Sequence, residues 1–381
     1  MKHRVAVIGN GNFGTAISKL LAENVLTHPD FDQKVYLWTF EEQIEGKNLS
    51  AIINETHENV KYLKGTKLPK NVFAEPDILK CVDACDVLVF VVPHQFVKNI
   101  VQKIKEKVAL NSCCTDIKCK NCHEDPKINI GSSKGSKKED KNENEPVNEQ
   151  VDVKKEKCGH SCLNLKPSNS EKNNNTKHLN DKRKYHAVSL IKGLFFDNNE
   201  IQRVSEYISN ELNLNCGVLM GANIATQIAN DAVSEATLSC KNEKSQKILM
   251  KLFNSFKFRV SVTRSLECIE LCGTLKNVVA IAYGIAKGLE YPDNTSVAIL
   301  RNGLKEIIKF CEMFCSYMDP MVFFESAGVA DLIVSCLNGR NFKCGVCVAN
   351  KMCIKDVEKN MDGQKLQGTS TSKGGLRVFK K

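Results

Sequence analysis

Short, uninterrupted apolar runs alternate with helical patterns up to about residue 264, apart from one polar stretch. The apolar runs predict strands at residues 5–9, 34–40, 86–93, 187–191, 216–220 and 258–263. They lack the alternating polar positions of a half-exposed strand, which indicates burial on both faces and therefore a mainly parallel sheet. Helical periodicity lies between several of the runs, for example over 198–212 and 243–253.

The pattern changes near residue 266, where long helical periods begin and no further strand is predicted. This change predicts a second, all-helical domain after the α/β domain, and 381 residues are enough to bury a core in each. The longest strongly apolar run, 87–92, is too short to cross a bilayer, and the first strand begins at the N-terminus. We therefore expect a cytosolic protein without a membrane segment or a leader peptide.

Residues 113–184 interrupt this order with a stretch rich in Asn, Lys, Glu and Ser. Such a composition cannot bury enough apolar surface to offset its ordering entropy, so we predict a disordered insertion between residues 1–112 and 185–264 of the first domain. Within it, a C-x-x-C-H motif begins at Cys119 and a C-x-H-x-C motif begins at Cys158. These are the residue types of a zinc site, but their separation exceeds that of familiar zinc modules, so unliganded thiols are the preferred interpretation and no metal is predicted.

Cysteine content and charge exclude two other classes of protein. Most of the 18 cysteines lie within hydrophobic patterns of a long chain, which favours reduced core thiols over a disulfide framework. The formal charge of +10 is spread along the sequence, without a basic helix that interleaves aromatic residues. Nucleic acid is therefore not predicted as a partner, and small anionic substrates suit this charge.

The first predicted strand runs directly into Gly9-x-Gly11-x-x-Gly14, and a helical pattern follows. In a strand–turn–helix unit, Gly9 permits the tight turn and Gly11 lets a pyrophosphate approach the backbone. Gly14 lets the helix pack closely, so that its free N–H groups face the phosphates. A glycine-rich turn in another α/β protein is the alternative. The expected fold is an α/β Rossmann-type N-terminal domain followed by an all-α C-terminal domain.

The end of the second predicted strand bears on the choice of cofactor. It reads Phe40-Glu41-Glu42, at the edge where this fold binds the adenosine ribose. Two carboxylates would repel a 2′-phosphate, and no arginine is present to bind one, which favours NAD over NADP. The Phe40 ring would stack on or flank adenine, or it would be an ordinary core residue at the strand end.

A lysine among small residues marks the candidate reaction site. In a helix, Lys276 shares a face with Gly273 and Ala280. Burial would lower the pKa of this lysine, so that it could donate and accept a proton near neutral pH. A snorkelling lysine at a domain edge is the alternative. Asp331, on one helix face with Ser335, would orient Lys276 or would form an ordinary salt bridge or cap.

Other candidates lie at the predicted cofactor edge of the sheet and in one turn of the helical region. Lys192 ends a predicted strand, and Arg340-Asn341 follows a turn that would aim a guanidinium and an amide at a phosphate. Phe96 follows another strand end and would lie over the dinucleotide. His94 is interpreted as a solvated loop residue without a role.

With these motifs, the chain closely resembles the NAD-dependent glycerol-3-phosphate dehydrogenases of the eukaryotic cytosolic type. The matching segments lie at 9–14, 57–63, 90–96, 189–193, 219–225, 275–280, 328–332, 339–341 and 363–368. The resemblance implies a cytoplasmic homodimer that interconverts dihydroxyacetone phosphate and sn-glycerol 3-phosphate, a precursor of glycerophospholipids, with NAD as its cofactor.

The resemblance also implies roles for individual residues. Lys276 would donate and accept the proton, with Asp331 and Lys192 beside it in the catalytic group. The residues around the substrate would be Lys192, Asn277, Ser335, Arg340 and Asn341, where Ser335 stands at a position at which the family often has Thr. The residues around the cofactor would be Gly9, Asn10, Gly11, Asn12, Phe13, Gly14, Phe40, Phe96, Ala225, Arg340, Lys365 and Gln367.

The C-terminus departs from the family pattern. After Gln367-Gly368 the family continues with further helices, whereas this chain continues with a short basic sequence that matches nothing. We therefore expect a truncated helical substrate domain at 265–368 and an unmatched tail at 369–381. The alternative function is a catalytically impaired dinucleotide-binding protein, and a third is a related dehydrogenase that acts on another phosphorylated or hydroxy-acid substrate.

Overall fold

The computed structural model describes residues 2–112, 184–197, 200–359 and 366–379. The predicted disordered insertion, with its Cys–His motifs, lies outside the described residues, and so does Lys365.

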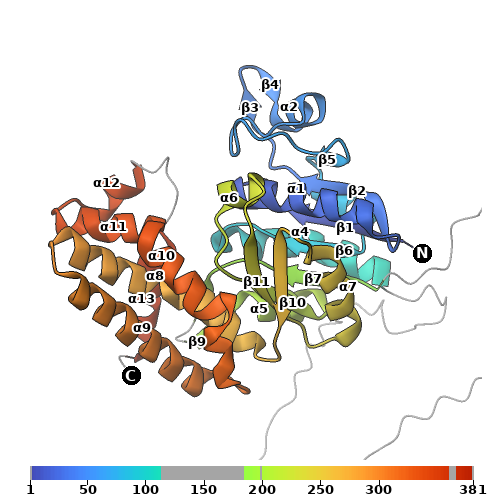
Figure 1. Ribbon diagram of the computed structural model, residues 1–381. Coiled ribbons are helices and arrows are strands. Elements are labelled where there is room, and N and C mark those ends of the chain that lie inside the picture. Colours follow the sequence, from blue (N-terminus) through green and yellow to red (C-terminus); the bar gives the residue numbers. More distant parts are fainter. Residues whose placement is uncertain (1, 113–183, 198–199, 360–365, 380–381) are drawn as a thin grey trace, which may run out of the picture. The chain divides into compact units, whose positions relative to one another are not determined.

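One eight-stranded sheet organises the N-terminal region (Figure 1), with the strand order β12-β11-β10-β7-β6-β1-β2-β5. Its strands are β1 His3–Ile8, β2 Phe31–Trp38, β5 Val72–Glu75, β6 Val87–Phe90, β7 His186–Ser189, β10 Cys216–Met220, β11 Ser234–Ser239 and β12 Phe258–Val262. Neighbouring strands pair in parallel except β10 and β11, which are antiparallel. Every residue of β6, β7 and β10 is buried, which explains the uninterrupted apolar sequences of β6 and β10. The predicted, mainly parallel sheet is therefore confirmed.

Helices cover both faces of this sheet. They are α1 Asn12–Thr27, α2 Leu49–Thr56, α3 Ile78–Ala84, α4 His94–Ser112, α5 Val204–Leu212, α6 Ala225–Ala229 and α7 Glu243–Phe253. Alternate residues of β1 enter different cores: Val5 and Val7 pack with α1 and α7, whereas Ala6 and Ile8 pack with α3, α4 and α5. A small hairpin of β3 (Gln43–Ile44) and β4 (Lys47–Asn48) precedes α2.

The helix predicted from residue 198 begins later, at Val204. A hairpin of β8 (Leu194–Asp197) and β9 (Glu200–Arg203) precedes it. The fully buried carboxylate of Glu270 accepts a hydrogen bond of 2.9 Å from the backbone N–H of Ser205. This carboxylate fixes where α5 begins, because it supplies the acceptor that the first turn of a helix lacks.

From residue 266 onward the described residues form helices only, as predicted. They are α8 Leu266–Gly288, α9 Asp293–Phe314, the 3₁₀ turn η1 Pro320–Phe324, the π turn η2 Ser326–Ala330, α10 Asp331–Asn338, α11 Arg340–Ala349, α12 Ile354–Lys359 and α13 Gln367–Phe379. The central helix α8 contacts α9, α10, α11 and α13 (Figure 1). The close approach of α11 to α8 requires a glycine on α11, because a Cβ on Gly345 would lie 2.2 Å from the carbonyl oxygen of Ile281 on α8.

Two features of this region differ from the expectations. Residues of the tail expected to match nothing form most of α13, which packs on α8. By length and composition alone, α8 would be able to cross a membrane, and 72% of its most apolar window is buried inside the protein. The search for continuous apolar runs did not reveal this, because Glu270 and Lys276 interrupt the apolar sequence of α8.

Candidate active site

The glycine loop joins β1 to α1, and two of its glycines are required by the protein's own backbone. Gly9 has a φ of +125°, and a Cβ on Gly14 would lie 1.9 Å from the carbonyl oxygen of Gly9. A Cβ on Gly11, in contrast, would meet no described atom within 4 Å. The open space at Gly11 is therefore available to a ligand that approaches the backbone closely.

The same loop offers hydrogen-bond donors suited to an anion. No side chain among the described residues caps the start of α1, whose first residues are Asn12 and Phe13. Asn10 is 5% exposed, and its Nδ2 has no hydrogen-bond partner among the described residues. Its Oδ1 accepts a bond of 3.2 Å from the N–H of Phe40. Uncapped helical N–H groups and a buried, unpaired amide fit the pyrophosphate of a dinucleotide.

Two aromatic rings lie exposed after strands that flank β1. Phe40 follows β2 and is 63% exposed, and Phe96, in the first turn of α4, is 51% exposed. The interpretation of Phe40 as an ordinary core residue is therefore wrong. Exposed rings at the carboxyl edge of a parallel sheet suit the faces of a dinucleotide's bases.

The two carboxylates after Phe40 have partners within the protein. Glu41 accepts a hydrogen bond of 3.1 Å from the N–H of Ser50 in the first turn of α2. Glu42 accepts bonds of 2.6 Å from Lys61 and 3.0 Å from the hydroxyl of Tyr62. Both carboxylates keep this edge of the sheet acidic, but each already accepts hydrogen bonds from groups of the protein.

The prediction that His94 lies in a solvated loop is wrong. This residue begins α4 rather than lying in a solvated loop, and its Nδ1 is buried without a hydrogen-bond partner among the described residues. Burial lowers the pKa of the imidazole. The cause is close packing, since a Cβ on Gly193 would lie 2.7 Å from that of His94.

Asp331 connects the two lysines that the sequence singled out. One of its carboxylate oxygens accepts a hydrogen bond from Nζ of Lys276, and the other accepts one of 2.8 Å from Nζ of Lys192. Lys276 also donates to the hydroxyl of Ser335 at 2.7 Å. Lys192 also donates to the carbonyl oxygen of Gly221, after β10, at 3.0 Å. Residues from the sheet edge, α8 and α10 therefore meet at one carboxylate.

Lys276 is held in a state suited to proton transfer. It is 5% exposed and Asp331 is 2% exposed. Burial lowers the pKa of the Lys276 ammonium to about 7, with the positive charge of Lys192 acting in the same direction and the Asp331 carboxylate opposing both. The predicted buried lysine is thus present in the structure, and the alternative of a snorkelling lysine is wrong.

A chain of amides extends from this group. Nδ2 of Asn341 donates to Oδ1 of Asn277 at 2.9 Å, and Oδ1 of Asn341 accepts a bond of 3.1 Å from the N–H of Gly368. Arg340, at the start of α11, is exposed. Gln367 begins α13 beside this chain and is half-buried.

Asn223, in the loop between β10 and α6, was not among the residues predicted from the sequence. Its Oδ1 is buried without a hydrogen-bond partner among the described residues. The adjacent Ala222 donates its N–H to Ser326, at the start of η2, at 3.2 Å. Ala225, which begins α6, is half-buried. In the sequence, the only sign of a role for Asn223 was its place in the segment 219–225 that matches the family. The unpaired Oδ1 can be recognised only in the structure.

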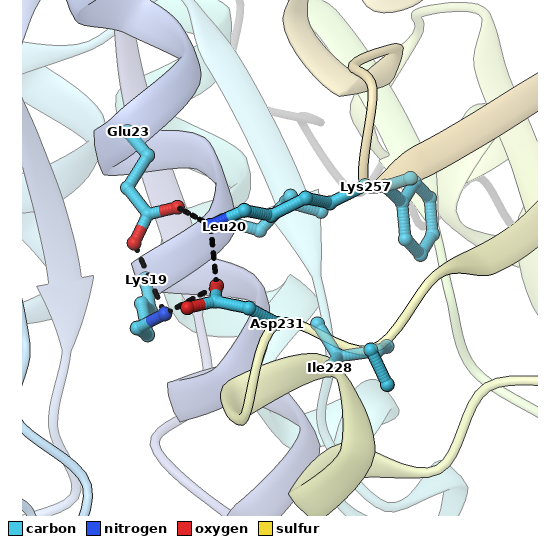
Figure 2. A pocket seen from close by; sticks show the side chains of 8 residues that line it. Lys19, Leu20, Glu23, Ile228, Asp231 and Lys257 are labelled. Atoms are coloured by element: carbon cyan, nitrogen blue, oxygen red, sulfur yellow. Dashed lines mark hydrogen bonds and ion pairs between the residues drawn. The ribbon is translucent and has the colours of Figure 1, made fainter.

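A separate pocket between α1, α6 and β12 does not belong to this site (Figure 2). Its charged groups pair with one another: Asp231 accepts bonds of 2.8 Å from Lys19 and 3.0 Å from Lys257. Lys19 also lies 3.0 Å from Glu23. Because these charges are matched inside the pocket, it offers little to a charged ligand.

A glycine loop suited to a dinucleotide and a buried lysine–carboxylate group in one chain are the features of a nicotinamide-dependent dehydrogenase. The profile described as NAD-dependent glycerol-3-phosphate dehydrogenase N-terminus matches residues 4–159 and 167–246, and the corresponding C-terminus profile matches 266–381. The chain belongs to the NAD-dependent glycerol-3-phosphate dehydrogenase family. NAD is its cofactor, as predicted, and the C-terminal match extends through the tail expected to match nothing.

Individual relatives agree with this assignment. The chain is 36% identical over 376 residues to the cytoplasmic glycerol-3-phosphate dehydrogenase [NAD(+)] of Drosophila virilis, covering 97% of this chain and 85% of the relative. The solved glycerol-3-phosphate dehydrogenase of Saccharomyces cerevisiae is 33% identical with a TM-score of 0.74, covering 100% of this chain and 91% of that one. The solved DsGPDH of Dunaliella salina is 30% identical with a TM-score of 0.76, covering 99% of this chain but 55% of that one. These similarities favour an active oxidoreductase over the catalytically impaired alternative.

Proposed function

We propose that this protein catalyses the reversible reduction of dihydroxyacetone phosphate to sn-glycerol 3-phosphate with NADH. The observation that carries the proposal is the buried Lys276, bonded to Asp331 and Ser335 within a dehydrogenase fold. Bound NADH supplies the hydride, and NAD⁺ accepts it in the reverse direction. The names of the relatives supply the substrate, and the basic site explains why a phosphorylated one would be held.

Lys276 is the proton donor for ketone reduction and the proton acceptor for alcohol oxidation. Its lowered pKa lets both protonation states exist near neutral pH, which a reversible reaction requires. Asp331 positions Lys276 and Lys192 through its two carboxylate oxygens. With Lys192 held beside it, the developing alkoxide meets two positive groups that need no rearrangement.

The remaining polar groups hold the substrate. Arg340 suits the phosphate, because its planar guanidinium makes paired hydrogen bonds to phosphate oxygens. Asn277, Ser335 and Asn341 bind the hydroxyl and phosphate oxygens of the substrate. Binding energy from the phosphate thereby orients the carbonyl carbon toward the hydride.

Most of the residues proposed to hold NAD follow strands at the carboxyl edge of the sheet. The phosphates rest on the loop of Gly9 to Gly14 and on the uncapped start of α1. Phe40 and Phe96 contact the bases or riboses with their exposed rings. The other residues proposed to contact NAD are Ala225, Arg340, Lys365 and Gln367.

A homodimer in the cytoplasm is part of this proposal. Large apolar side chains of the helical region are exposed at Val297 (58%), Met321 (62%) and Phe324 (73%), which a partner subunit would cover. The relatives are named cytoplasmic enzymes, and the product would supply glycerophospholipid synthesis. Light scattering of the purified protein tests the dimer, and the mass of a single chain contradicts it.

NADH oxidation in the presence of dihydroxyacetone phosphate tests the activity. Lys276→Ala abolishes turnover and leaves NADH binding nearly unchanged, since Lys276 acts on the substrate. Near-normal kcat in that variant would refute its role. Parallel assays with other phosphorylated ketones and with 2-oxo acids test whether the protein is instead a related dehydrogenase that acts on another substrate. That interpretation requires one of these compounds to have a higher kcat/KM than dihydroxyacetone phosphate.

A further inference from the structure

Four cysteines on two neighbouring helices lie outside the site described above. Cys268 and Cys272 are one turn apart on α8, and Cys311 and Cys315 are one turn apart at the end of α9. The sulfur atoms of Cys268, Cys311 and Cys315 all lie within 4.8 Å of one another. Cys272 shares the helix face of Cys268 but lies outside this group of three mutually close sulfur atoms. We call these four residues the thiol cluster.

The spacing of the thiol cluster suits a tetrahedral metal ion. Zinc binds thiolate sulfur at about 2.3 Å with tetrahedral geometry, which separates neighbouring sulfur atoms by roughly 3.8 Å. Three sulfurs within 4.8 Å of one another approach that arrangement before any ion is bound. Residues four apart share one helix face, so each helix supplies a pair of thiols toward the other helix.

The surroundings allow an ion to reach the cluster and remain there. Cys268 and Cys311 are fully buried and Cys272 is 3% exposed, whereas Cys315, at the end of α9, is half-buried and provides a path from solvent. Sγ of Cys268 donates to the carbonyl oxygen of Tyr317 at 3.6 Å. The cluster thus has an open side toward solvent and a closed side toward the core.

We propose that Cys268, Cys311 and Cys315 bind a thiophilic divalent metal ion, with Zn²⁺ as the natural occupant and Cys272, on the helix face of Cys268, as a fourth ligand. Each ligand forms a metal–sulfur bond and releases one proton to solvent. No electron is transferred. The bound ion ties α8, the helix that carries Lys276, to α9 and so serves a structural purpose.

Metal binding by the reduced full-length chain tests the proposal. After treatment with chelator and reductant, the protein is titrated with Co²⁺ and then with Zn²⁺. We expect one Co²⁺ per chain with a sulfur-to-cobalt charge-transfer band and the visible spectrum of a tetrahedral site, and we expect Zn²⁺ to remove both signals. Absence of these bands would overturn the proposal.

Matched variants locate the site. The double variant Cys311→Ser/Cys315→Ser should lose the cobalt signal. Cys81→Ser/Cys85→Ser, another buried pair one turn apart, should retain it. Cys119→Ser/Cys122→Ser should retain it as well, and loss there alone would assign the metal to the insertion and refute the proposal.

A single variant covers the case in which the double variant does not fold. Cys315→Ser changes only the half-buried member, and NADH binding reports whether the chain is folded. In the folded variant we expect weaker Zn²⁺ binding by at least tenfold. Unchanged affinity, or a disulfide within the cluster in the freshly isolated protein by non-reducing mass spectrometry, contradicts the proposal.

Discussion

The carboxylate of Asp331 holds the ammonium of Lys276, although the two residues lie 55 positions apart in the sequence. Replacing Asp331 by Asn keeps the volume but leaves Lys276 and Lys192 without their common counter-charge. We expect kcat to fall by about 10²-fold or more, because both positive groups lose their orientation. Steady-state assays check this. Asp293→Asn, which removes an exposed partner of Lys287, should retain wild-type kcat.

The pH dependence of the two reaction directions should be opposite. Reduction needs protonated Lys276, so its kcat/KM falls as pH rises through about 7, the lowered pKa of this group. Oxidation of sn-glycerol 3-phosphate needs the neutral amine, so its kcat/KM rises through the same range. Profiles of kcat/KM against pH, measured for reduction and for oxidation, check this. If kcat/KM changed with pH in the same direction for both reactions, the assignment of Lys276 as proton donor and acceptor would be refuted.

Replacing two glycines of the loop by alanine should affect different properties, NADH binding in one variant and stability in the other. Gly11→Ala places a methyl group in the open space and should leave the fold intact while weakening NADH binding by about 1 kcal/mol or more. Gly14→Ala places its methyl group against the carbonyl of Gly9 and should destabilise the fold itself. Thermal unfolding and NADH titration separate the effects. Equal losses of stability would contradict the interpretation of Gly11.

Acid should destabilise the protein through His186 as well as through its carboxylates. Burial is the main reason that the pKa of His186 is lowered from 6.5 to about 4. The unfolded chain takes up this proton at a higher pH than the folded one, so the free energy of unfolding decreases as pH falls from 6.5 to 4, by about 3 kcal/mol for this group.

Replacement of His186 by Asn tests this contribution. Asn can keep the hydrogen bond to the hydroxyl of Ser245, which is 2.8 Å long, but it does not titrate. Urea unfolding at several pH values should show a shallower dependence for His186→Asn than for the wild type. Identical slopes would assign the acid sensitivity to the carboxylates alone.

Much of the sheet was predictable because its central strands are buried on both faces. β11 escaped prediction because most of its polar residues are buried as well, and only Glu235 is exposed. One of them, Thr237, accepts a hydrogen bond of 3.2 Å from the N–H of Ala327 in the helical region. A buried hydroxyl that is satisfied from a distant part of the chain has the same sequence signature as an exposed one.

The sequence allowed the residues of the candidate site to be named, but it did not predict the contacts between them. Lys276, Lys192 and Asp331 were all named from the sequence, but the bridge between Lys192 and Asp331 spans 139 positions. The surroundings of His94 were missed for a related reason, since its packing against Gly193 depends on tertiary contacts. Pairings set by tertiary packing cannot be obtained from local patterns alone.

The link from Gly368 through Asn341 to Asn277 has a consequence for how the chain matures on the ribosome. The strands of the sheet are all synthesised before residue 264, so the nucleotide-binding half can assemble while later segments are still being translated. The amides beside Lys276 close into a network only after the start of α13 has emerged and docked. A nascent chain should therefore bind NADH before it can select its substrate.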